Sequence, residues 1–463
     1  MTKSYSLTSG AILPMMIRYT LPLIFTNLLQ VCYTIADNII VGLSGEPEAV
    51  GAIGTTTAFI NLTVNIFIGC SIGTKVIVAR HIGAQNREKV EDAVHTSILI
   101  SLIFGLICAL IGIIISAPIL SAMGNRGNLL TLAVLYAKIY FLSVPFTAVT
   151  NFAVAIIQAN GNTKTPLYIL SGSGLLNVLL NLLFVLGFGM NVEGVAIATI
   201  ISTAVSSVLL LGYLIKNKGI CHLQIRKLAI KIKVLKDILL IGMPAAVQNA
   251  LFSFSHMLVQ SSVLIVNNSI ASANSTFQPI VKGCSVCTSI ESIACTVVNS
   301  IGHSAVPFVA QNAGAENYDR IKIGRIIWYS VAFFVSSAVA LLLIVLKEPL
   351  FALYGVTKVS TDALIKIAYE AAYTRMLIMF IPYFLLAFME VGGAFLQGFG
   401  KSVTASAISL TGSCLFRIIW LLTVFSAKPT LEIVFISFPI SWLITASAHF
   451  IFGSIELKRR TKA

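Results

Sequence analysis

Charged residues are scarce in this sequence of 463 residues, and acids are the scarcer sign. Asp, Glu, Lys and Arg make up 10% of the chain, with 17 acids against 31 bases, whereas hydrophobic residues make up 57%. An ordinary soluble protein carries roughly 25% charged residues, so this chain could not cover a water-exposed surface. The composition excludes a disordered chain, a coiled coil and a nucleic-acid-binding protein, and it indicates that lipid is the solvent.

Motifs for enzymatic chemistry and for metal binding are missing as well. The sequence has no HExxH motif, no GxxxxGK[ST] phosphate loop and no Ser/His or Cys/His pair with a supporting acid. We therefore expect no enzymatic activity, no direct use of ATP and no cofactor. Cys284 and Cys287 form a CxxC, but no second Cys or His pair follows at zinc spacing, so we interpret the eight cysteines as small apolar residues.

Long apolar runs, in contrast, are abundant. A helix needs about 20 mostly apolar residues to cross roughly 30 Å of hydrocarbon, and helices satisfy their backbone groups within one segment. The runs predict twelve membrane spans, at residues 15–43, 49–80, 94–119, 131–158, 165–188, 192–215, 237–267, 272–310, 323–346, 370–398, 402–425 and 431–454. Five prolines inside these spans are expected bend points: Pro22, Pro145, Pro244, Pro307 and Pro382.

The charges in the loops predict the orientation of the chain. Residues 216–236 carry seven bases and no acid, and further bases follow spans 2, 8 and 12, whereas the opposite loops carry Glu46, Glu48 and Glu193. Because cytoplasmic loops are enriched in Lys and Arg, both termini are expected on the cytoplasmic side of the cell inner or plasma membrane. The net charge of +14 is then a topology signal.

The chain also repeats itself at an offset that grows from 222 to 239 residues. The pairs are Leu21-Pro22 with Met243-Pro244, VARHIGA (78–84) with VAQNAGA (309–315), and QANG (158–161) with QGFG (397–400). Such a repeat indicates an old duplication. It predicts an N-terminal lobe of residues 1–215, a basic linker of residues 216–236 and a C-terminal lobe of residues 237–463.

An even number of spans per repeat makes both halves run in the same sense across the membrane. The predicted fold is therefore an all-α integral membrane protein with twelve transmembrane helices. They form two six-helix bundles related by a pseudo-two-fold axis along the membrane normal. Two bundles around a central cavity are typical of secondary transporters that work by alternating access. We expect a monomer in the lipid bilayer, with a small molecule as its substrate.

Six short strings, in this order within a duplicated chain, carry a family resemblance. They are YTIADNIIVG (33–42), VARHIGA (78–84), QANGNT (158–163), LNVLLNLLFV (176–185), GVAIAT (194–199) and QNAGA (311–315). With them the chain resembles the MATE (multidrug and toxic compound extrusion) transporters over nearly its whole length. The resemblance implies export of organic cations or other amphipathic compounds in exchange for inward Na⁺ or H⁺.

Only three acids, Asp37, Glu291 and Glu390, lie clearly inside apolar runs. Burying a charge there costs about 2.5–3.5 kcal/mol, so each is a functional candidate. Asp37, Asn181 and Thr199 each lie roughly 10 Å from the outer end of their span, and Asn177 lies one turn deeper than Asn181. These oxygen-bearing side chains predict one cation or proton site in the first half. An interhelical polar clasp without an ion is the alternative.

The family resemblance adds roles to these positions. Asp37, Asn177 and Thr199 match positions that form the cation or proton site of prokaryotic MATE proteins. Asn181 departs from that pattern, because many relatives carry Asp there. One carboxylate is neutralised equally well by one Na⁺ or one proton, so both coupling ions stay open. By repeat offset, Asp37 corresponds to Val259 and Asn177 to Arg417, so the second half cannot hold the same site.

The second half has its own charges within the spans. Glu390 and Arg417 lie on neighbouring elements and could pair, which would relieve the cost of burying each. Glu291 is a candidate counter-charge for the substrate or a second proton carrier, and Lys282 lies too far along the helix to contact it. Some MATE proteins of gut-type Gram-positive bacteria look similar at 291, 390 and 417. Lys75 and Lys282 could bias the cavity against cationic drugs.

Two other functions compete with drug antiport. A flippase for lipid-linked oligosaccharides would share the architecture, but such flippases usually have extra spans or a strongly cationic cavity. A channel would need a selectivity filter, and the sequence has no such signature. The Asp37 cluster in the first half therefore favours antiport.

Overall fold

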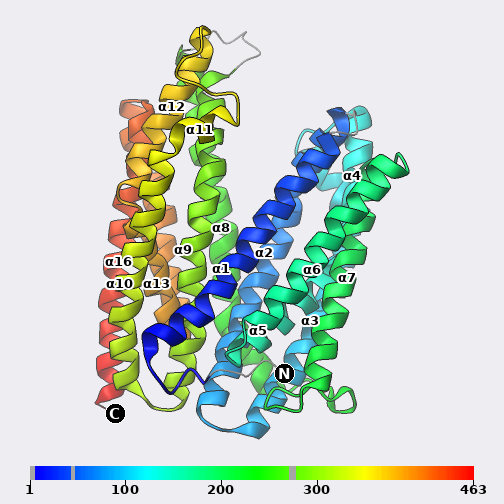
Figure 1. Ribbon diagram of the computed structural model, residues 1–463, viewed down its shortest axis with the longest axis vertical. Helices are drawn as coiled ribbons and strands as arrows, with labels where there is room; N and C mark the ends of the chain where they lie inside the picture. The colour runs from blue at the N-terminus through cyan, green and yellow to red at the C-terminus, as the bar shows by residue number, and fades with distance from the viewer. Residues whose placement is uncertain (1–5, 43–46, 271–277, 463) are drawn as a thin grey trace. The chain divides into compact units, whose positions relative to one another are not determined.

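The computed structural model describes residues 6–42, 47–270 and 278–462, and these residues form helices and connecting turns without a β-strand (Figure 1). The first half contains α1 (Ile12–Gly42), α2 (Pro47–Gly83), α3 (Arg87–Ala122), α4 (Gly127–Phe141), α5 (Val144–Ala159), α6 (Lys164–Asn181), η1 (Leu182–Gly187) and α7 (Val192–Lys216). Next come η2 (Ile225–Lys227), α8 (Ile232–Ile270), α9 (Pro279–Gly314), α10 (Tyr318–Val345) and α11 (Lys347–Ala352). The chain continues with α12 (Ala363–Phe380), α13 (Tyr383–Gly398), α14 (Ser402–Ser409), η3 (Leu410–Leu415), α15 (Phe416–Trp420), η4 (Leu421–Phe425) and α16 (Leu431–Thr461).

The described residues contain twelve candidate spans when each bent helix pair is taken as one span. Ten helices are long and apolar enough to cross a membrane, and the pairs α4–α5 and α12–α13 pass the same test together. The order and number agree with the prediction. The span ends predicted at 43 and 272, and Glu46, lie outside the described residues, as does the side chain of Glu48.

Both bent spans break next to a proline. The axes of α4 and α5 differ by 47°, with Pro145 in the first turn of α5, and those of α12 and α13 differ by 49°, with Pro382 at the junction. A proline lacks the N–H that continues a helix, which explains the breaks. Pro22, Pro244 and Pro307 lie inside helices that continue past them, and a bend at these three prolines stays a prediction.

The chain divides into two compact units. Unit 1 contains residues up to Val247 together with Ala310–Asn317, and unit 2 contains Gln248–Val309 and the residues from Tyr318 onward. The chain therefore passes from one unit to the other within α8 and α9. The lobe boundaries inferred from the repeat, at residues 215 and 237, stay a prediction.

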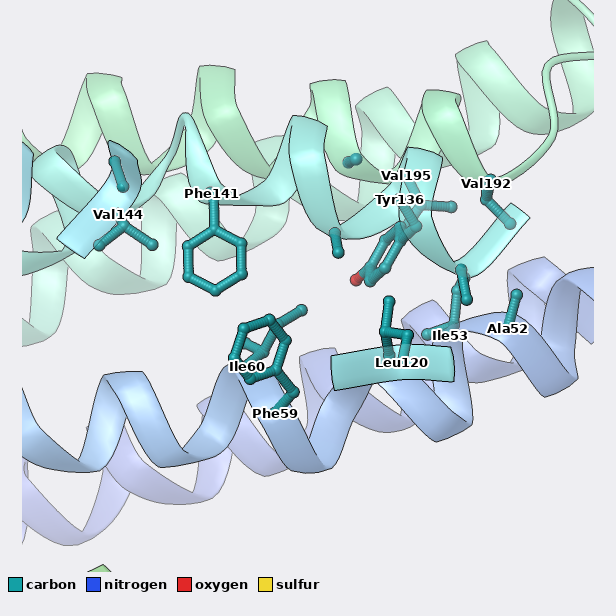
Figure 2. Close-up of a cluster of buried hydrophobic side chains, with 14 of the residues drawn as sticks. Ala52, Ile53, Phe59, Ile60, Leu120, Tyr136, Phe141, Val144, Val192 and Val195 are labelled. Carbon is teal, nitrogen blue, oxygen red and sulfur yellow. The ribbon is translucent and has the colours of Figure 1, made fainter. Parts of the chain in front are cut away.

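The core of unit 1 is a cluster of aromatic and aliphatic side chains, most of them from α2, α3, α4 and α7 and a few from α1, α5 and η1 (Figure 2). The rings of Phe59 and Phe141 face each other with their centroids 5.0 Å apart. Tyr136 lies in the same cluster near Val195 and Ile53. This packing holds α4 and α7 against α2, next to the polar residues described below.

One face of α3 is apolar yet exposed. Leu106, Leu110 and Ile114 follow one another at four-residue spacing and are 54%, 62% and 66% exposed. A row of this kind in water would be an aggregation-prone patch, whereas in a bilayer it meets lipid tails. The row supports the interpretation that lipid is the solvent of this chain.

Two copies of the repeated motif meet within unit 1 through their glycines. A Cβ on Gly83, at the end of α2, would overlap the carbonyl oxygen of Gln311. A Cβ on Gly314, at the end of α9, would overlap the carbonyl oxygen of Arg80. Arg80 and Gln311 occupy the same position of the motif, so the contact is reciprocal, as in a two-fold interface. Gln311 also donates to the carbonyl of Ala159 at 2.6 Å.

The basic linker is fixed to α3 by hydrogen bonds. The backbone N–H of Gln224 donates to Nε2 of His95 at 3.0 Å, and Nδ1 of the same ring lies 2.6 Å from the carbonyl of Glu91. Thr96 Oγ1 accepts from the N–H of Lys231 at 3.1 Å and donates to the carbonyl of Ala229 at 3.3 Å. Two neighbouring side chains therefore hold the linker on unit 1.

Replacing His95 by Ala should loosen this linker. The change removes the acceptor of the Gln224 N–H, and a typical hydrogen bond contributes about 1 kcal/mol. We expect limited trypsin digestion to cut after Arg226 and Lys227 several times faster than in the unmodified protein. His222→Ala is the matched control, because Nδ1 of His222 in the same linker has no hydrogen-bond partner among the described residues. Equal cleavage rates in both variants would show that His95 does not hold the linker.

Unit 2 packs around α13 and α16. Nδ1 of His449 on α16 lies 3.0 Å from the carbonyl of Met389, and Nε2 lies 3.2 Å from the carbonyl of Ala405. Trp328 of α10 stacks on Phe308 with ring centroids 4.5 Å apart, and its indole N–H donates to Ser304 Oγ at 3.1 Å. These buried polar contacts are satisfied, so they fix the register of the helices that carry the charged residues of this unit.

Candidate functional site

The position of Asp37 depends on how closely α1 approaches α6. Tyr33 lies one turn before Asp37 on α1, and its hydroxyl donates to the carbonyl of Ser171 at 3.0 Å. Its ring lies where a side chain on Gly174 would be, since a Cβ there would overlap the ring. The small residue on α6 and the hydrogen bond together hold the helices in contact, which brings Asp37 to the residues that follow Gly174.

The carboxylate of Asp37 contacts Asn181 directly. Asn181 Nδ2 donates to Asp37 Oδ1 at 2.6 Å, and the Asn181 side chain is fully buried. Asn181 Oδ1 has no hydrogen-bond partner within the described part of the chain. A buried, unsatisfied amide oxygen next to a carboxylate is a ready ligand for a hard cation, which prefers oxygen.

Asn177 completes the contact with Asp37 from one turn away. When its amide nitrogen faces the carboxylate, Asn177 donates to Oδ1 and Oδ2 of Asp37 at 3.1 and 3.3 Å. Its oxygen then accepts from Ser202 Oγ at 3.2 Å. This orientation gives every group of the amide a suitable partner, and such assignments follow from the hydrogen-bond network.

Thr199 belongs to the same region, but its hydroxyl is directed elsewhere. It donates to the carbonyl of Val195 on its own helix at 2.9 Å. Ser202, three residues further along α7, contacts Asn177 instead. The structure therefore brings Asp37, Asn177 and Asn181 together and adds Ser202 in the place expected for Thr199. The i, i+3 spacing from Thr199 to Ser202 was the signal that could have identified Ser202.

Two further features surround this cluster. Tyr136 and Tyr140 of α4 lie within electrostatic range of Asp37, although neither was selected from the sequence. The π-helical stretch η1 begins directly after Asn181, and η4 begins one turn after Arg417, the repeat equivalent of Asn177. Short π-helical stretches inside α-helices occur frequently at functional sites.

Replacing Gly174 by Ala should damage the site without touching its polar residues. The added Cβ must displace the Tyr33 ring, which breaks the bond to Ser171 and moves Asp37 away from α6. Overpacking of this kind costs about 1–3 kcal/mol, so we expect the affinity of the Asp37 cluster for Na⁺ or a proton to fall about tenfold or more in equilibrium binding. Gly172→Ala is the control, because a Cβ at Gly172 meets nothing within 4 Å. Equal ion affinity of both variants would contradict the assigned role of the close approach.

The charges of unit 2 pair differently from the prediction. Glu291 forms an ion pair of 2.7 Å with Arg375 of α12, a residue that the sequence analysis did not select. The expected ion pair of Glu390 with Arg417 is absent from the described residues. Glu390 on α13 lies against Gly302 of α9, whereas Arg417 on α15 turns toward α16, so the two side chains face different neighbours. Lys282 lies in the first turn of α9, near Gly355.

The described residues contain no group of three or more His, Cys, Asp or Glu side chains that could hold a metal ion. Cys284 and Cys287 are buried free thiols. The oxygens of the Asp37 cluster, which come from a carboxylate, two amides and the Ser202 hydroxyl, suit a small hard cation or a proton.

Comparison with known proteins decides the family. The model of the MatE family matches this chain twice, at residues 22–183 and at residues 244–423. The chain belongs to the MatE family. The two matches start at Pro22 and Pro244, the residues that begin the repeat, so this MatE chain is a duplication, as predicted. The resemblance to the MATE transporters is thereby confirmed.

Relatives of this MatE chain are described as multidrug proteins. A probable multidrug resistance protein, YoeA of Bacillus subtilis (strain 168), is 29% identical over 313 residues. The match covers 66% of this chain and 65% of YoeA. The multidrug export protein MepA of Staphylococcus aureus (strain MRSA252) is 26% identical over 255 residues, which cover 55% of this chain and 56% of MepA. The matched region thus spans about two thirds or less of these relatives.

Solved structures confirm the fold over the whole chain. An outward-facing structure of a multidrug resistance MATE family transporter of the MOP superfamily superimposes with a TM-score of 0.89 at 20% identity and covers 100% of this chain and 99% of its own. A MOP superfamily transporter from Pyrococcus furiosus Vc1 (DSM3638) gives a TM-score of 0.90 at 19% identity, again covering 100% of this chain and 99% of its own. The MatE chain therefore has the fold of the MATE transporters, an all-α fold of twelve helices in two bundles.

Proposed function

We propose that this MatE protein is a secondary active transporter. It exports organic cations or other amphipathic, drug-like compounds in exchange for inward H⁺ or Na⁺ by alternating access. The observation that carries the proposal is the cluster in which Asp37 contacts Asn181 at 2.6 Å, beside an amide oxygen without a partner among the described residues. A single half-buried carboxylate cycles between a charged and a neutralised state, and this change is what couples ion entry to substrate exit.

The cluster provides for either ion. Asn177 and Asn181 donate to the ionised carboxylate, so it has partners before an ion arrives. Arrival of Na⁺ would recruit the Asn181 oxygen as a further ligand, and arrival of H⁺ would turn the carboxylate into a donor. Both reactions neutralise one charge. Ser202 supplies a hydroxyl oxygen on α7 beside Asn177.

We also propose the placement of the chain. The protein is multi-pass in the cell inner or plasma membrane, with both termini and the basic linker in the cytoplasm. The positive charge of residues 216–236 supports this orientation. It acts on small molecules as a monomer.

A transport assay with two separate gradients tests the function. Inverted membrane vesicles containing the protein receive either an outward Na⁺ gradient or an outward proton gradient, and uptake of a fluorescent organic cation is followed. We expect uptake under one of the two gradients, and collapse of that gradient by its ionophore should stop it. Vesicles without the protein provide the background. The antiport would be refuted if the vesicles took up cationic, neutral and anionic amphiphiles no faster than vesicles without the protein, under either gradient.

A lipid or oligosaccharide-lipid flippase is the second candidate function. Buried positive charge favours it, because Lys75 on α2 and Arg417 on α15 have no ion-pair partner within 4.0 Å in the described part of the chain. For the Pyrococcus transporter, a reversed polarity of the binding pocket suggests a different function. Movement of an anionic lipid analogue without any ion gradient would support this alternative.

A further inference from the structure

Arg417 is a buried cation with no counter-ion among the described residues. The residue is only 3% exposed, and its Nε donates to Ser441 Oγ of α16 at 3.0 Å. Its guanidinium carbon lies 4.0 Å from the centroid of the Phe438 ring. No carboxylate of the described chain lies within 4.0 Å of it, and its two terminal nitrogens have no acceptor there. A neutral hydroxyl and a ring face therefore hold a full positive charge.

A guanidinium carries five N–H donors, and one hydrogen bond leaves four of them unused. Uncompensated charge inside a membrane-embedded bundle is costly and usually marks a substrate or ion site. The fork of an arginine matches a carboxylate, which accepts two parallel hydrogen bonds. The counter-ion that would match the Arg417 guanidinium is therefore an anion with two oxygens in one plane, such as a carboxylate.

The acids of unit 2 do not supply this anion. Glu291 interacts with Arg417 at long range, but its carboxylate is bound to Arg375 at 2.7 Å. Glu390 lies against Gly302 on α9 and makes no ion pair with any described residue. The group around Arg417 thus holds two guanidinium groups against one nearby carboxylate, and its local charge is positive.

Phe438 is the aromatic side chain at Arg417, and further rings pack next to it. Phe438 lies 5.9 Å from Trp442 and 6.4 Å from Phe435, measured between ring centroids, and Trp442 lies 5.8 Å from Tyr383. The guanidinium of Arg375 lies 4.9 Å from the centroid of Phe435. Rings beside a fixed cation suit a ligand that is itself aromatic and carries its negative charge at one end.

The repeat supplies an independent argument. Arg417 stands at the position equivalent to Asn177, which contacts the carboxylate of Asp37 in the first half. The same position therefore serves a small cation or proton in one half and presents a positive charge in the other. The two equivalent positions therefore suit ligands of opposite charge, a cation in the first half and an anion in the second.

From these observations we propose that Arg417 binds the carboxylate of an aromatic substrate, with Phe435, Phe438 and Trp442 against its ring. The proposal rests on the proposed transport function and narrows its substrates to aromatic compounds that carry a carboxylate, zwitterions included. The bond formed is a bidentate ion pair between the guanidinium and the carboxylate, and no covalent step is involved.

Equilibrium binding to the full-length protein tests this site without any ion gradient. The probes are naphthalene-2-carboxylate, its methyl ester and 2-naphthylmethylammonium, which share one ring system and differ in charge. Affinities are measured in phosphatidylcholine nanodiscs by quenching of tryptophan fluorescence. We expect the carboxylate to bind more tightly than the ester and the ammonium. In Arg417→Gln the carboxylate should lose about tenfold or more in affinity, and the ester should keep its own.

Two variants separate binding from folding. Arg417→Lys keeps the charge without the planar fork and should retain part of the preference for the carboxylate. Arg325→Gln is the matched control, because Arg325 is also bound to a serine of α16, Ser454 at 2.8 Å, and lies 4.6 Å from the ring of Phe450. It should bind all three probes normally. Thermal unfolding of each variant, followed by size-exclusion chromatography, reports on folding.

Three results would overturn the proposal. The first is equal affinity of the unmodified protein for the three probes. The second is unchanged carboxylate binding in Arg417→Gln, or the same loss in Arg325→Gln. The third is loss of carboxylate binding when phosphatidylglycerol is added to the nanodiscs, which would assign Arg417 to a lipid headgroup. Because no gradient is applied, failure of ion-coupled transport would leave this binding result intact, so the two proposals fail separately.

Discussion

Asp37→Asn should reduce ion-coupled transport to the background of vesicles without the protein. The amide keeps the size of the carboxylate and its place beside Asn177 and Asn181, but it carries no charge and takes up no proton. Charged hydrogen bonds contribute about 1.5–3 kcal/mol, so the affinity for the coupling ion should fall at least about tenfold. The variant should still fold, since the interhelical contacts of Tyr33 with α6 are retained.

The measurement is the vesicle assay with separate Na⁺ and proton gradients. Glu193→Gln is the control, because Glu193 lies in the first turn of α7 outside the cluster and its loss should leave transport unchanged. Asp37→Glu keeps the charge and should restore part of the activity if the longer side chain still reaches Asn181. Transport by Asp37→Asn at the rate of the unmodified protein would refute the assignment of the coupling group.

Gly83→Ala and Gly314→Ala should each destabilise the protein. Each added Cβ would overlap a backbone carbonyl of the other copy of the motif, residues 78–84 or 309–315. A helix end must then move to relieve the overlap. Such overpacking costs about 1–3 kcal/mol, which should lower the temperature of thermal unfolding by several degrees. Gly212→Ala serves as the control, because a Cβ at Gly212 meets nothing within 4 Å.

The double variant gives the sharper test. Once the first Cβ has pushed the ends of α2 and α9 apart, the second meets less resistance. The combined loss of stability should therefore be clearly smaller than the sum of the two single losses. Strictly additive losses would indicate that the two glycines contact independent surfaces.

Much of the fold followed from the sequence because lipid imposes simple rules. Apolar runs predicted the twelve spans, since each must cross the same thickness. Two of the five prolines predicted the bends of α4–α5 and α12–α13 correctly. Pro22, Pro244 and Pro307 lie inside helices that continue past them, so as bend points they stay a prediction.

The sequence predicted the depth of the candidate site residues in the membrane and their helix face, but not the direction of their side chains. Depth placed Asp37 and Asn181 at one level, and they are in contact. Depth alone could not show that the Thr199 hydroxyl bonds its own helix while Ser202 reaches Asn177. Adjacency suggested an ion pair of Glu390 with Arg417, but adjacency does not fix the direction of a side chain. Arg375 was missed because its partner Glu291 lies 84 residues away in sequence.

The π-helical stretch after Asn181 has one more consequence. A π-turn holds an extra residue compared with an α-turn, so a helix absorbs a single insertion or deletion there without a break in its backbone. Residues before Leu182 keep their positions when this happens. The end of the helix that follows Asn181 is thus free to lengthen or shorten over evolutionary time, which would adapt the chain to thicker or thinner bilayers while the carboxylate and its two amides keep their places.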